Sequence, residues 1–302
     1  MFKDMLKHDE TLFKDELVFD YEYLPRLLKY RENQQQEFAN AIKPLLQGRV
    51  GSNLVVVGTP GIGKTAACRF VLREMEDYSD KVYGIYVNCW KAETAYKVVV
   101  AICEQLGYKW IQNKKTDELM REVAKILNKK SVVIILDEVD KLKEEQVIYQ
   151  LLEDVYKKSL FLITNEKDFL AKMDDRIKSR LLAEVLEFKP YSEEEVRGIL
   201  GERKELGFFE GVFVDGFDNI VSKCFELKDV RSGIHLLKLA GEVAENKSKK
   251  IIEKEDVDIA ISKLDGFVRS KVVLDNEEKE IIEVIKENNG EVFSEVFKVY
   301  SE

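Results

Sequence analysis

The chain has 302 residues, of which 45% are hydrophobic and 35% charged, and this length is enough for roughly two domains of about 150 residues each. Its formal net charge of −9 argues against a protein that coats DNA along its length, because such proteins are usually basic, so any nucleic-acid contact must be local. No run of about 18 apolar residues occurs, so we expect no membrane span, and the first residues predict no signal peptide.

The four cysteines and two histidines give little support for metal or thiol chemistry. The cysteines are scattered through apolar stretches without a CxxC pair, which is typical of reduced thiols in a cytoplasmic protein rather than of a disulfide framework or a zinc site. With only two histidines in the chain, nucleophilic catalysis by a Ser-His or Cys-His pair is also poorly supported.

The first 190 residues predict an arm followed by an α/β domain. Residues 1–30 show no clear period, and we interpret them as an arm that lies on the domain that follows. Residues 31–47 have the spacing of a helix, although Pro44 strains its end. The predicted strands are 53–57, 82–87, 131–136, 159–164 and 184–188, and the predicted helices between them are 64–77, 93–106, 116–128 and 144–156. Strands that are continuous Val/Ile/Leu runs indicate a parallel sheet covered on both faces.

After Pro190 the pattern changes to helices, which dominate from 192 to about 265. The last 28 residues predict two short amphipathic helices broken at Asn289-Gly290. We therefore divide the chain into four parts. They are the arm 1–30, the α/β base domain 31–190, a helical domain 191–267, and a final segment 268–302.

The stretch "NLVVVGTPGIGKTAACRF" (residues 53–70) carries the pattern GxxxxGK[ST] between a predicted strand and a predicted helix. Such a loop turns backbone N–H groups around phosphates at a helix N-terminus, and a glycine-rich turn that binds nothing is the weaker alternative. We expect Lys64 to reach the β/γ-phosphate oxygens and Thr65 to place its hydroxyl on Mg²⁺. The residues predicted to surround the phosphates are Gly58, Gly61, Ile62, Gly63, Lys64, Thr65 and Ala66.

A second strand supplies the carboxylates that a phosphate loop lacks. In "SVVIILDEVD", Asp137 ends the strand where ligands of a parallel sheet gather, and we expect it to hold Mg²⁺ through the metal's water shell. Glu138 is then placed to orient or deprotonate the attacking water. The alternative is a solvated acidic turn. Because a small-molecule kinase has less need of this glutamate, the pair favours an NTP hydrolase.

Three further segments offer polar groups to the same site. Asn165 directly follows a strand and is predicted to sense the γ-phosphate, although many such residues are only turn or cap residues. Arg180, or less favourably Arg176, is predicted to reach a neighbouring subunit's nucleotide rather than remain a solvated charge. Arg231 starts a helix, where an unpaired cation opposes the helix dipole. A phosphate partner would explain it, and a solvated or salt-bridged arginine is the alternative.

With these residues the sequence resembles the AAA+ ATPases, and among them the archaeal replication initiators related to the largest origin-recognition subunit and to the cell-division-control helicase loader. The resemblance covers nearly the whole chain and includes "LFKDELVFDYEYLPRLLKYRENQQQEFANAIKPLLQG", "YVNCWKAETAYKVVVAICEQLG", "ILDEVDKL", "KPYSEEEVRGILGER" and "DVRSGIHLLKLAGEVAE". It implies an α/β P-loop AAA+ base with a parallel sheet, an all-helical lid domain, and the start of a winged-helix domain at 268–302.

The resemblance also implies roles for matching residues. Tyr191 and Arg203 would contact the nucleotide, the arm around Leu24, Pro25 and Arg31 would border the adenine, and Arg231 would contact phosphate from the lid. The cofactors would be ATP or ADP with Mg²⁺. ATP would act as a slowly hydrolysed switch, because a site shared by two domains couples the ligand to their orientation. Implied partners are duplex origin DNA, the replicative helicase, and a second copy or a paralogous initiator. The protein would be cytoplasmic and nucleoid-associated.

Three departures from the family pattern bear on function. The family usually has a Pro- or Gly-containing turn after residue 107 that opens a DNA-contacting helix, whereas this chain has "YKWIQNKKTDEL", which retains Lys109, Lys114 and Lys115. Lys228 stands where the family has glycine before Asp229. The final segment corresponds to the first two helices of a winged-helix domain, so we expect a shortened chain or a cut-down relative with weakened DNA binding.

Two alternatives to an ATP-dependent initiator follow. One is a regulatory module that holds nucleotide almost permanently and acts through protein partners, which the acidic charge and the altered segment after residue 107 favour. The other is a different AAA+ remodeller, such as a clamp-loader-like or transposition ATPase. It accounts less well for the arm and for the "YVNC" strand.

Overall fold

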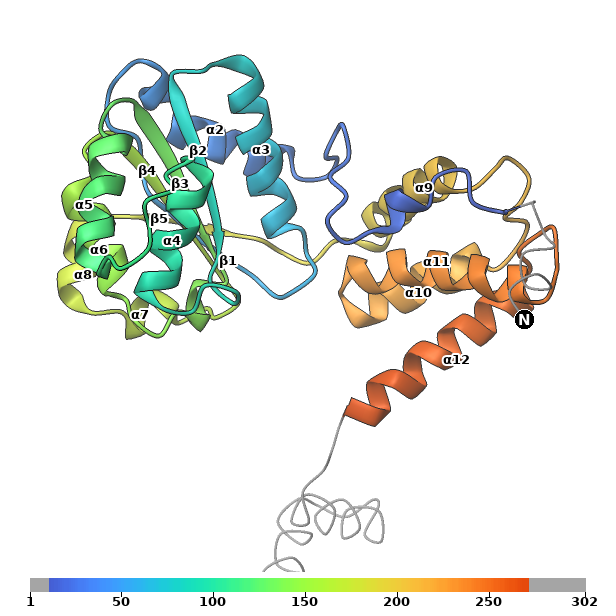
Figure 1. Cartoon of the computed structure of the whole chain (residues 1–302). Helices are drawn as coiled ribbons and strands as arrows, with labels where there is room; N and C mark the ends of the chain where they lie inside the picture. The colour runs from blue at the N-terminus through green and yellow to red at the C-terminus, as the bar shows by residue number, and fades with distance from the viewer. Residues whose placement is uncertain (1–10, 272–302) are drawn as a thin grey trace, which may run out of the picture.

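The computed structural model describes residues 11–271, with side chains through residue 266. Figure 1 shows two parts, an α/β base domain and an all-helical lid, with the arm running between them. The predicted final segment from 272 onward, with its break at Asn289-Gly290, lies outside the described residues. Among residues 11–271, no helix has both the length and the apolar character needed to cross a membrane.

The base is built on one sheet of five parallel strands in the order β2-β3-β4-β1-β5. The strands are β1 Leu54–Val57, β2 Val82–Asn88, β3 Ser131–Asp137, β4 Lys158–Thr164 and β5 Glu184–Glu187. Every residue of β3 and β4 is buried, which is why these strands are continuous apolar runs in the sequence. The predicted parallel AAA+ sheet is confirmed, and each strand begins and ends within about one residue of its predicted bounds.

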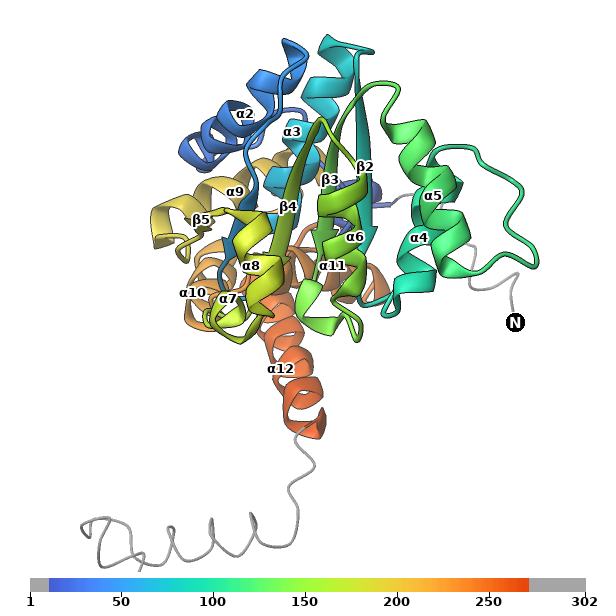
Figure 2. The ribbon, with the colours of Figure 1, turned by 90° about the vertical axis from the view of Figure 1, so that its left-hand side faces the viewer.

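Helices cover both faces of the sheet, as Figure 2 shows. One face packs against α2 Glu32–Leu46 and α3 Lys64–Tyr78, and the other packs mainly against α4 Ala95–Gln105, α5 Thr116–Leu127, α6 Gln146–Asp154 and α8 Asp175–Leu181. Three short elements complete the base and arm: η1 Glu16–Phe19, η2 Val139–Lys141 and α7 Phe169–Lys172. Helices α7 and α8 were not among the predicted elements.

The lid consists of α9 Glu193–Gly207, α10 Phe217–Leu227, α11 Val230–Asn246 and α12 Lys254–Lys271. Ser192 and Glu195 form a capping box that starts α9, because each side chain accepts a hydrogen bond from the other's backbone N–H. Ala240 and Ala244 on α11 are fully buried and let the other lid helices pack closely around it. The predicted helical domain is confirmed.

The arm does not simply lie on the base domain, so that prediction is wrong for its first half. Phe13 and Phe19 pack against Phe208 of the lid, with ring centroids 5.1 and 5.0 Å away. A Cβ built on Gly207 would lie 2.1 Å from the Phe19 ring, so α9 ends in a glycine that admits this ring. Only further along does the arm reach the base, where Leu24 and Leu28 pack beside α2 and α3.

Candidate nucleotide site between base and lid

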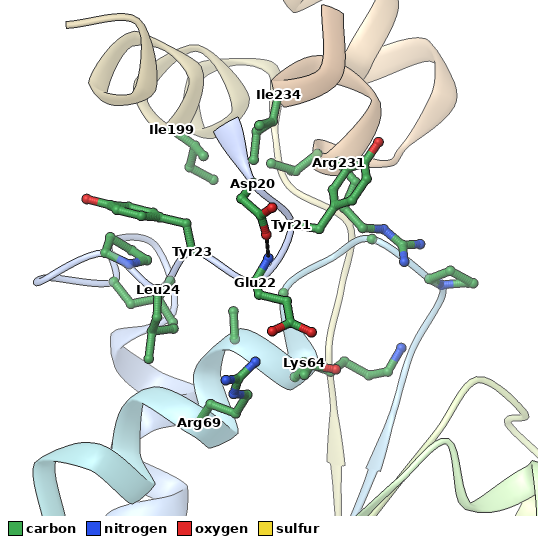
Figure 3. Close-up of a pocket in the computed structure, with 18 of the residues that line it drawn as sticks. Asp20, Tyr21, Glu22, Tyr23, Leu24, Lys64, Arg69, Ile199, Arg231 and Ile234 are labelled. Carbon is green, nitrogen blue, oxygen red and sulfur yellow. Dashed lines mark hydrogen bonds between the residues drawn. The ribbon is translucent and has the colours of Figure 1, made fainter. Parts of the chain in front are cut away.

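A cavity of about 450 Å³ lies at the carboxyl edge of the sheet, between base, arm and lid (Figure 3). Lys64 and Arg69 enter it from α3, whereas Ile199, Arg231 and Ile234 enter from the lid helices. Of the residues predicted to bind the cofactor or act in catalysis, the following line the cavity: Leu24, Pro25, Gly61, Gly63, Lys64, Thr65, Ala66, Asp137, Glu138, Asn165, Tyr191, Arg203 and Arg231. Gly58, Ile62, Arg31 and Arg180 do not.

The Lys64 ammonium is enclosed by acceptors of its own domain. It donates to the Gly58 carbonyl (2.7 Å), the Thr59 carbonyl (2.9 Å) and Asn165 Oδ1 (2.8 Å). Burial lowers the pKa of Lys64 to about 8, with nearby Asp137 opposing that shift and Arg231 adding to it. A phosphate group in the loop would give the ammonium an anionic partner and would raise this pKa again. Gly58 therefore acts through its carbonyl, while the Ile62 side chain is buried in the core.

Thr65 and Asp137 meet at the edge of the sheet. The Thr65 hydroxyl donates to Asp137 Oδ2 at 2.6 Å, and the Tyr86 hydroxyl donates to the same oxygen at 2.7 Å. The other carboxylate oxygen accepts the Glu138 N–H at 2.9 Å. Asp137 is thus a buried carboxylate held by three donors. Burial and this neighbouring carboxylate raise the pKa of Tyr86, which keeps its hydroxyl a donor.

Glu138 follows in the left-handed backbone region, with φ of 53°, at the start of η2. Partial burial, together with the charges of Asp137 and Asp140, raises the pKa of its carboxyl above the ordinary value. A raised pKa makes the carboxylate a better proton acceptor. Asp140 in turn fixes the next strand, because its Oδ1 accepts the Thr164 hydroxyl (3.0 Å) and the Asn165 N–H (3.4 Å). Asp140 thereby holds Asn165 where its amide meets Lys64.

The lid touches the phosphate loop directly through the start of α11. The Val230 N–H donates to the Gly61 carbonyl at 3.2 Å, and a Cβ built on Gly61 would lie 1.9 Å from Asp229 Oδ1. Glycine at position 61 is therefore needed for the approach of the lid as well as for its positive φ of 74°. Lys228 takes a left-handed φ of 54°, which the family's glycine would adopt at less cost.

Arg231 is not the unpaired cation that its position predicts. Its Nε and Nη2 donate to the two oxygens of Asp229, each at 3.2 Å, and Asp229 also caps α11 by accepting the Arg231 N–H at 2.9 Å. The cap residue thus neutralises the arginine that would otherwise oppose the helix dipole. Arg231 still lines the cavity and is half exposed.

Arg31 lies behind the phosphate loop rather than beside the cavity, which corrects its expected place at the adenine. The buried guanidinium donates to the Ile62 carbonyl (2.9 Å from Nη2) and to the Lys189 carbonyl (2.8 Å), and it stacks 3.6 Å from the Tyr191 ring centroid. Tyr191 itself lines the cavity, and a Cβ on Gly63 would lie 2.6 Å from its hydroxyl oxygen. Arg31 therefore ties the loop to the segment that leads into the lid.

Arg203 and the two candidate trans arginines also have partners. Arg203 is buried at the rim of the cavity and donates to the Val18 carbonyl (2.8 Å) and the Tyr23 carbonyl (3.3 Å), so it secures the arm to the lid. On α8, Arg180 lies 3.5 Å from Glu153 and over the Tyr149 ring, and Arg176 pairs with Asp174. Neither α8 arginine lines the cavity of its own chain.

Among the residues of this site that the sequence interpretation missed are Tyr86, Asp140, Asp229 and Arg69. Asp140 belongs to the "DEVD" motif, and its position after Glu138 was the available signal. Asp229 directly precedes Arg231 and has the residue type of a helix cap, which predicts its pairing. Tyr86 and Arg69 carry no such signal, because only the packing of α3 on β2 brings them to the cavity.

The residues present fit a Mg²⁺ ion that arrives with a nucleotide. The Thr65 hydroxyl and the Asp137 carboxylate are hard oxygen donors at one point of the cavity. Mg²⁺ commonly uses one or two such protein groups and takes its other ligands from phosphates and water. Across residues 11–271, no group of three or more His, Cys, Asp or Glu is placed to hold a metal by itself.

Comparison with known proteins identifies the family. Residues 48–172 match the AAA domain family, and residues 197–262 match the Cdc6 AAA+ ATPase-type lid domain. The ORC1-type DNA replication protein 1 of Archaeoglobus fulgidus is 33% identical over 87% of this chain and 68% of its own length. The ORC1-type DNA replication protein 2 of Methanosarcina mazei is 33% identical over 99% of this chain and 84% of its own.

Among solved structures, that of the Aeropyrum pernix ORC1 protein in complex with DNA is 29% identical, with a TM-score of 0.77, and covers 97% of this chain and 82% of that one. The fold, the two family matches and the similar proteins all indicate the same family as the motifs that line the cavity. The chain therefore belongs to the family of archaeal ORC1/Cdc6-type DNA replication proteins, which are AAA+ ATPases.

Proposed function

We propose that this chain is an ATP-dependent initiator of DNA replication, in which binding and slow hydrolysis of ATP with Mg²⁺ set the angle between base and lid. In this proposal the chain binds duplex origin DNA and takes part in loading the replicative helicase. The observation that carries the proposal is the contact of the lid with the phosphate loop through Val230 and Asp229. In this proposal a phosphate bound in the loop replaces contacts that the loop makes with the lid as well as contacts that it makes within the base.

The chemistry divides among the base residues as follows. Lys64 would exchange backbone carbonyls for β- and γ-phosphate oxygens, and Asn165 would stay beside it near the γ-phosphate. Thr65 and Asp137 would hold Mg²⁺, whose charge offsets that developing on the transferred phosphoryl group. Glu138 would accept a proton from the attacking water.

The lid would respond through the partner exchange of Arg231. In the described structure Asp229 occupies its guanidinium, and a phosphate oxygen would compete for the same donors. Arg180 and Arg176, which lie outside the cavity of their own chain, would serve a neighbouring copy or a paralogous initiator. Slow turnover follows if the exchange of partners at the lid, rather than bond cleavage, limits each cycle.

DNA as a partner is supported by the similarity of this chain to the Aeropyrum pernix ORC1 protein, whose structure was solved in complex with DNA. On this chain the turn after α4 offers a local surface for such contact. The Trp110 side chain is 78% exposed, and the exposed Lys109 and Lys115 lie in the same turn, without an inserted helix. Lysines of this kind would contact phosphates and make DNA binding sensitive to salt.

The proposal is tested by measuring ATP turnover and duplex-DNA binding for the wild type, Glu138→Gln, and Glu122→Gln as a matched control on α5. We expect slow turnover in the wild type and in the control, and a loss of roughly 100-fold or more in Glu138→Gln with nucleotide binding retained. DNA binding should weaken as salt rises, and Lys109→Ala with Lys115→Ala should reduce the salt slope by about one per lysine.

Other outcomes separate the alternatives. Tight nucleotide binding without turnover or DNA binding in the wild type would support the regulatory module that acts through protein partners. Turnover that survives Glu138→Gln would remove Glu138 from the reaction. DNA binding insensitive to both lysine changes would place the DNA surface elsewhere on the chain.

A further inference from the structure

Tyr86 is a conspicuous polar group at the cavity to which none of the motifs assigns a role. It lies on β2, and its hydroxyl donates to Asp137 Oδ2 at 2.7 Å. The carboxylate can only accept at this contact, so the direction of the hydrogen bond is set. The same oxygen also accepts the Thr65 hydroxyl, at 2.6 Å. Two hydroxyl groups from two different elements therefore meet on one carboxylate oxygen.

The register of the sheet explains why a tyrosine can make this contact. Asn88 is the direct neighbour of Asp137 in the adjacent strand, and Tyr86 pairs with Ile135. Residues two apart on a strand share a face, so Tyr86 lies on the same face as Asp137 and one diagonal position away. A long aromatic side chain spans such a diagonal, and its hydroxyl arrives at the carboxylate. A phenylalanine would fill the same space but would donate no hydrogen bond.

We propose that Tyr86 is a positioning residue for the Mg²⁺ site, which it serves by holding the Asp137 carboxylate in the orientation that binds the Thr65 hydroxyl proton. With its proton committed to Asp137, the Thr65 oxygen keeps its lone pairs for the cation. The inference rests on the proposed binding of nucleotide with Mg²⁺ in this cavity. It adds to that proposal a residue that acts on the metal site through Asp137.

A cation completes the arrangement. The Arg69 guanidinium lies 5.5 Å from the centroid of the Tyr86 ring, and Figure 3 shows Arg69 projecting from α3 toward the cavity. Arg69 and Thr65 are four residues apart on α3 and share a helix face. One turn of α3 thus supplies both the metal-binding hydroxyl and the cation on the ring that positions its partner. Arg69, Tyr86 and Asp137 therefore form one continuous set of contacts along the wall of the cavity.

The test compares Tyr86→Phe with Tyr83→Phe, a control on the same strand whose ring lies on the opposite face. The affinity of the full chain for ATP is measured by direct titration at a series of Mg²⁺ concentrations and in EDTA. We expect ATP affinity in EDTA to be unchanged in both variants. In Tyr86→Phe the Mg²⁺ concentration giving half of the metal-dependent gain in affinity should rise about ten-fold, as for other groups that orient metal ligands. Tyr83→Phe should match the wild type.

Every result other than the expected one overturns either the proposed function or the role of Tyr86, and the result shows which of the two is wrong. If the wild type shows no Mg²⁺-dependent gain, the proposed function fails before Tyr86 is tested. If the wild type shows the gain and Tyr86→Phe equals it, the positioning role is wrong. If Tyr86→Phe binds Mg²⁺ and ATP more tightly, the hydroxyl competes with the metal, which also overturns the inference. Equal losses with and without Mg²⁺ would indicate a packing role only.

Discussion

The carboxyl edge of the sheet and the boundary between base and lid are held together in different ways. At the edge, side chains contact one another within the base, as Thr65 does with Asp137 and Lys64 with Asn165. At the boundary, buried arginines bind backbone carbonyls of other segments, as Arg31 does on the phosphate loop and Arg203 on the arm. The contacts at the edge therefore bring polar side chains together in one place, whereas the contacts at the boundary fix separate segments of the chain to one another.

The largest expected effect lies at the boundary, in Arg31→Met. This change leaves the Ile62 and Lys189 carbonyls without their buried donor, so the free energy of unfolding should fall by about 2–3 kcal/mol. Denaturant unfolding measures it. Arg73→Met is the matched control, since Arg73 also donates to a backbone carbonyl of another segment, that of Pro25 in the arm, but from a more exposed position. Its loss should lower the free energy of unfolding by less than about 1 kcal/mol. Equal losses of unfolding free energy in the two variants would show that the burial of Arg31 does not make its hydrogen bonds more stabilising than those of Arg73.

The second prediction concerns the edge and uses pH. Burial lowers the pKa of Lys64 to about 8, so the ammonium that binds phosphate is lost as pH rises through 8 in the nucleotide-free protein. ATP affinity should then fall by up to about ten-fold per pH unit above 8, if bound phosphate restores the ordinary pKa. Titration of ATP at pH 7, 8 and 9 measures it.

Lys64→Arg is the control for this pH dependence, since arginine stays charged throughout the range. Stability should change with pH in the opposite direction to ATP affinity. The folded pKa lies below the unfolded 10.5, so between pH 8 and 10.5 the unfolded chain binds more protons, and stability relative to Lys64→Arg should rise with pH. ATP affinity that stays constant from pH 7 to 9 would contradict the lowered pKa.

The smallest effect is expected for Asp229→Asn, which sharpens the contrast because it changes the boundary without removing the cap. Asparagine caps helices about as well as aspartate, so α11 should stay intact. The charge that holds Arg231 is removed, and ATP affinity should rise a few-fold, in line with the small energy of a half-exposed ion pair. Asp218→Asn, away from the cavity, should leave the affinity unchanged. Weaker ATP binding in Asp229→Asn would mean that Asp229 aids the nucleotide rather than competes for Arg231.

Much of the fold followed from local pattern. The apolar strands lie close to the bounds that their sequences predict, because full burial requires a continuous apolar strand. The helical character of the lid also followed from its sequence, whereas the bounds of its individual helices did not. The phosphate loop, Asp137, Glu138 and Asn165 lie at one cavity for a related reason. In a parallel sheet, residues that follow different strands share one edge.

What only the tertiary structure decided was the choice of partner for each charged or polar group. The sequence identified Arg31, Arg203 and Arg231 as residues of interest, but not that the first two bind carbonyls far along the chain and the third its own helix cap. The lid approach that requires Gly61, and the diagonal that brings Tyr86 to Asp137, likewise depend on how separate elements pack. A hydrogen bond between distant segments leaves no periodicity in the sequence, whereas burial of a strand or helix face does.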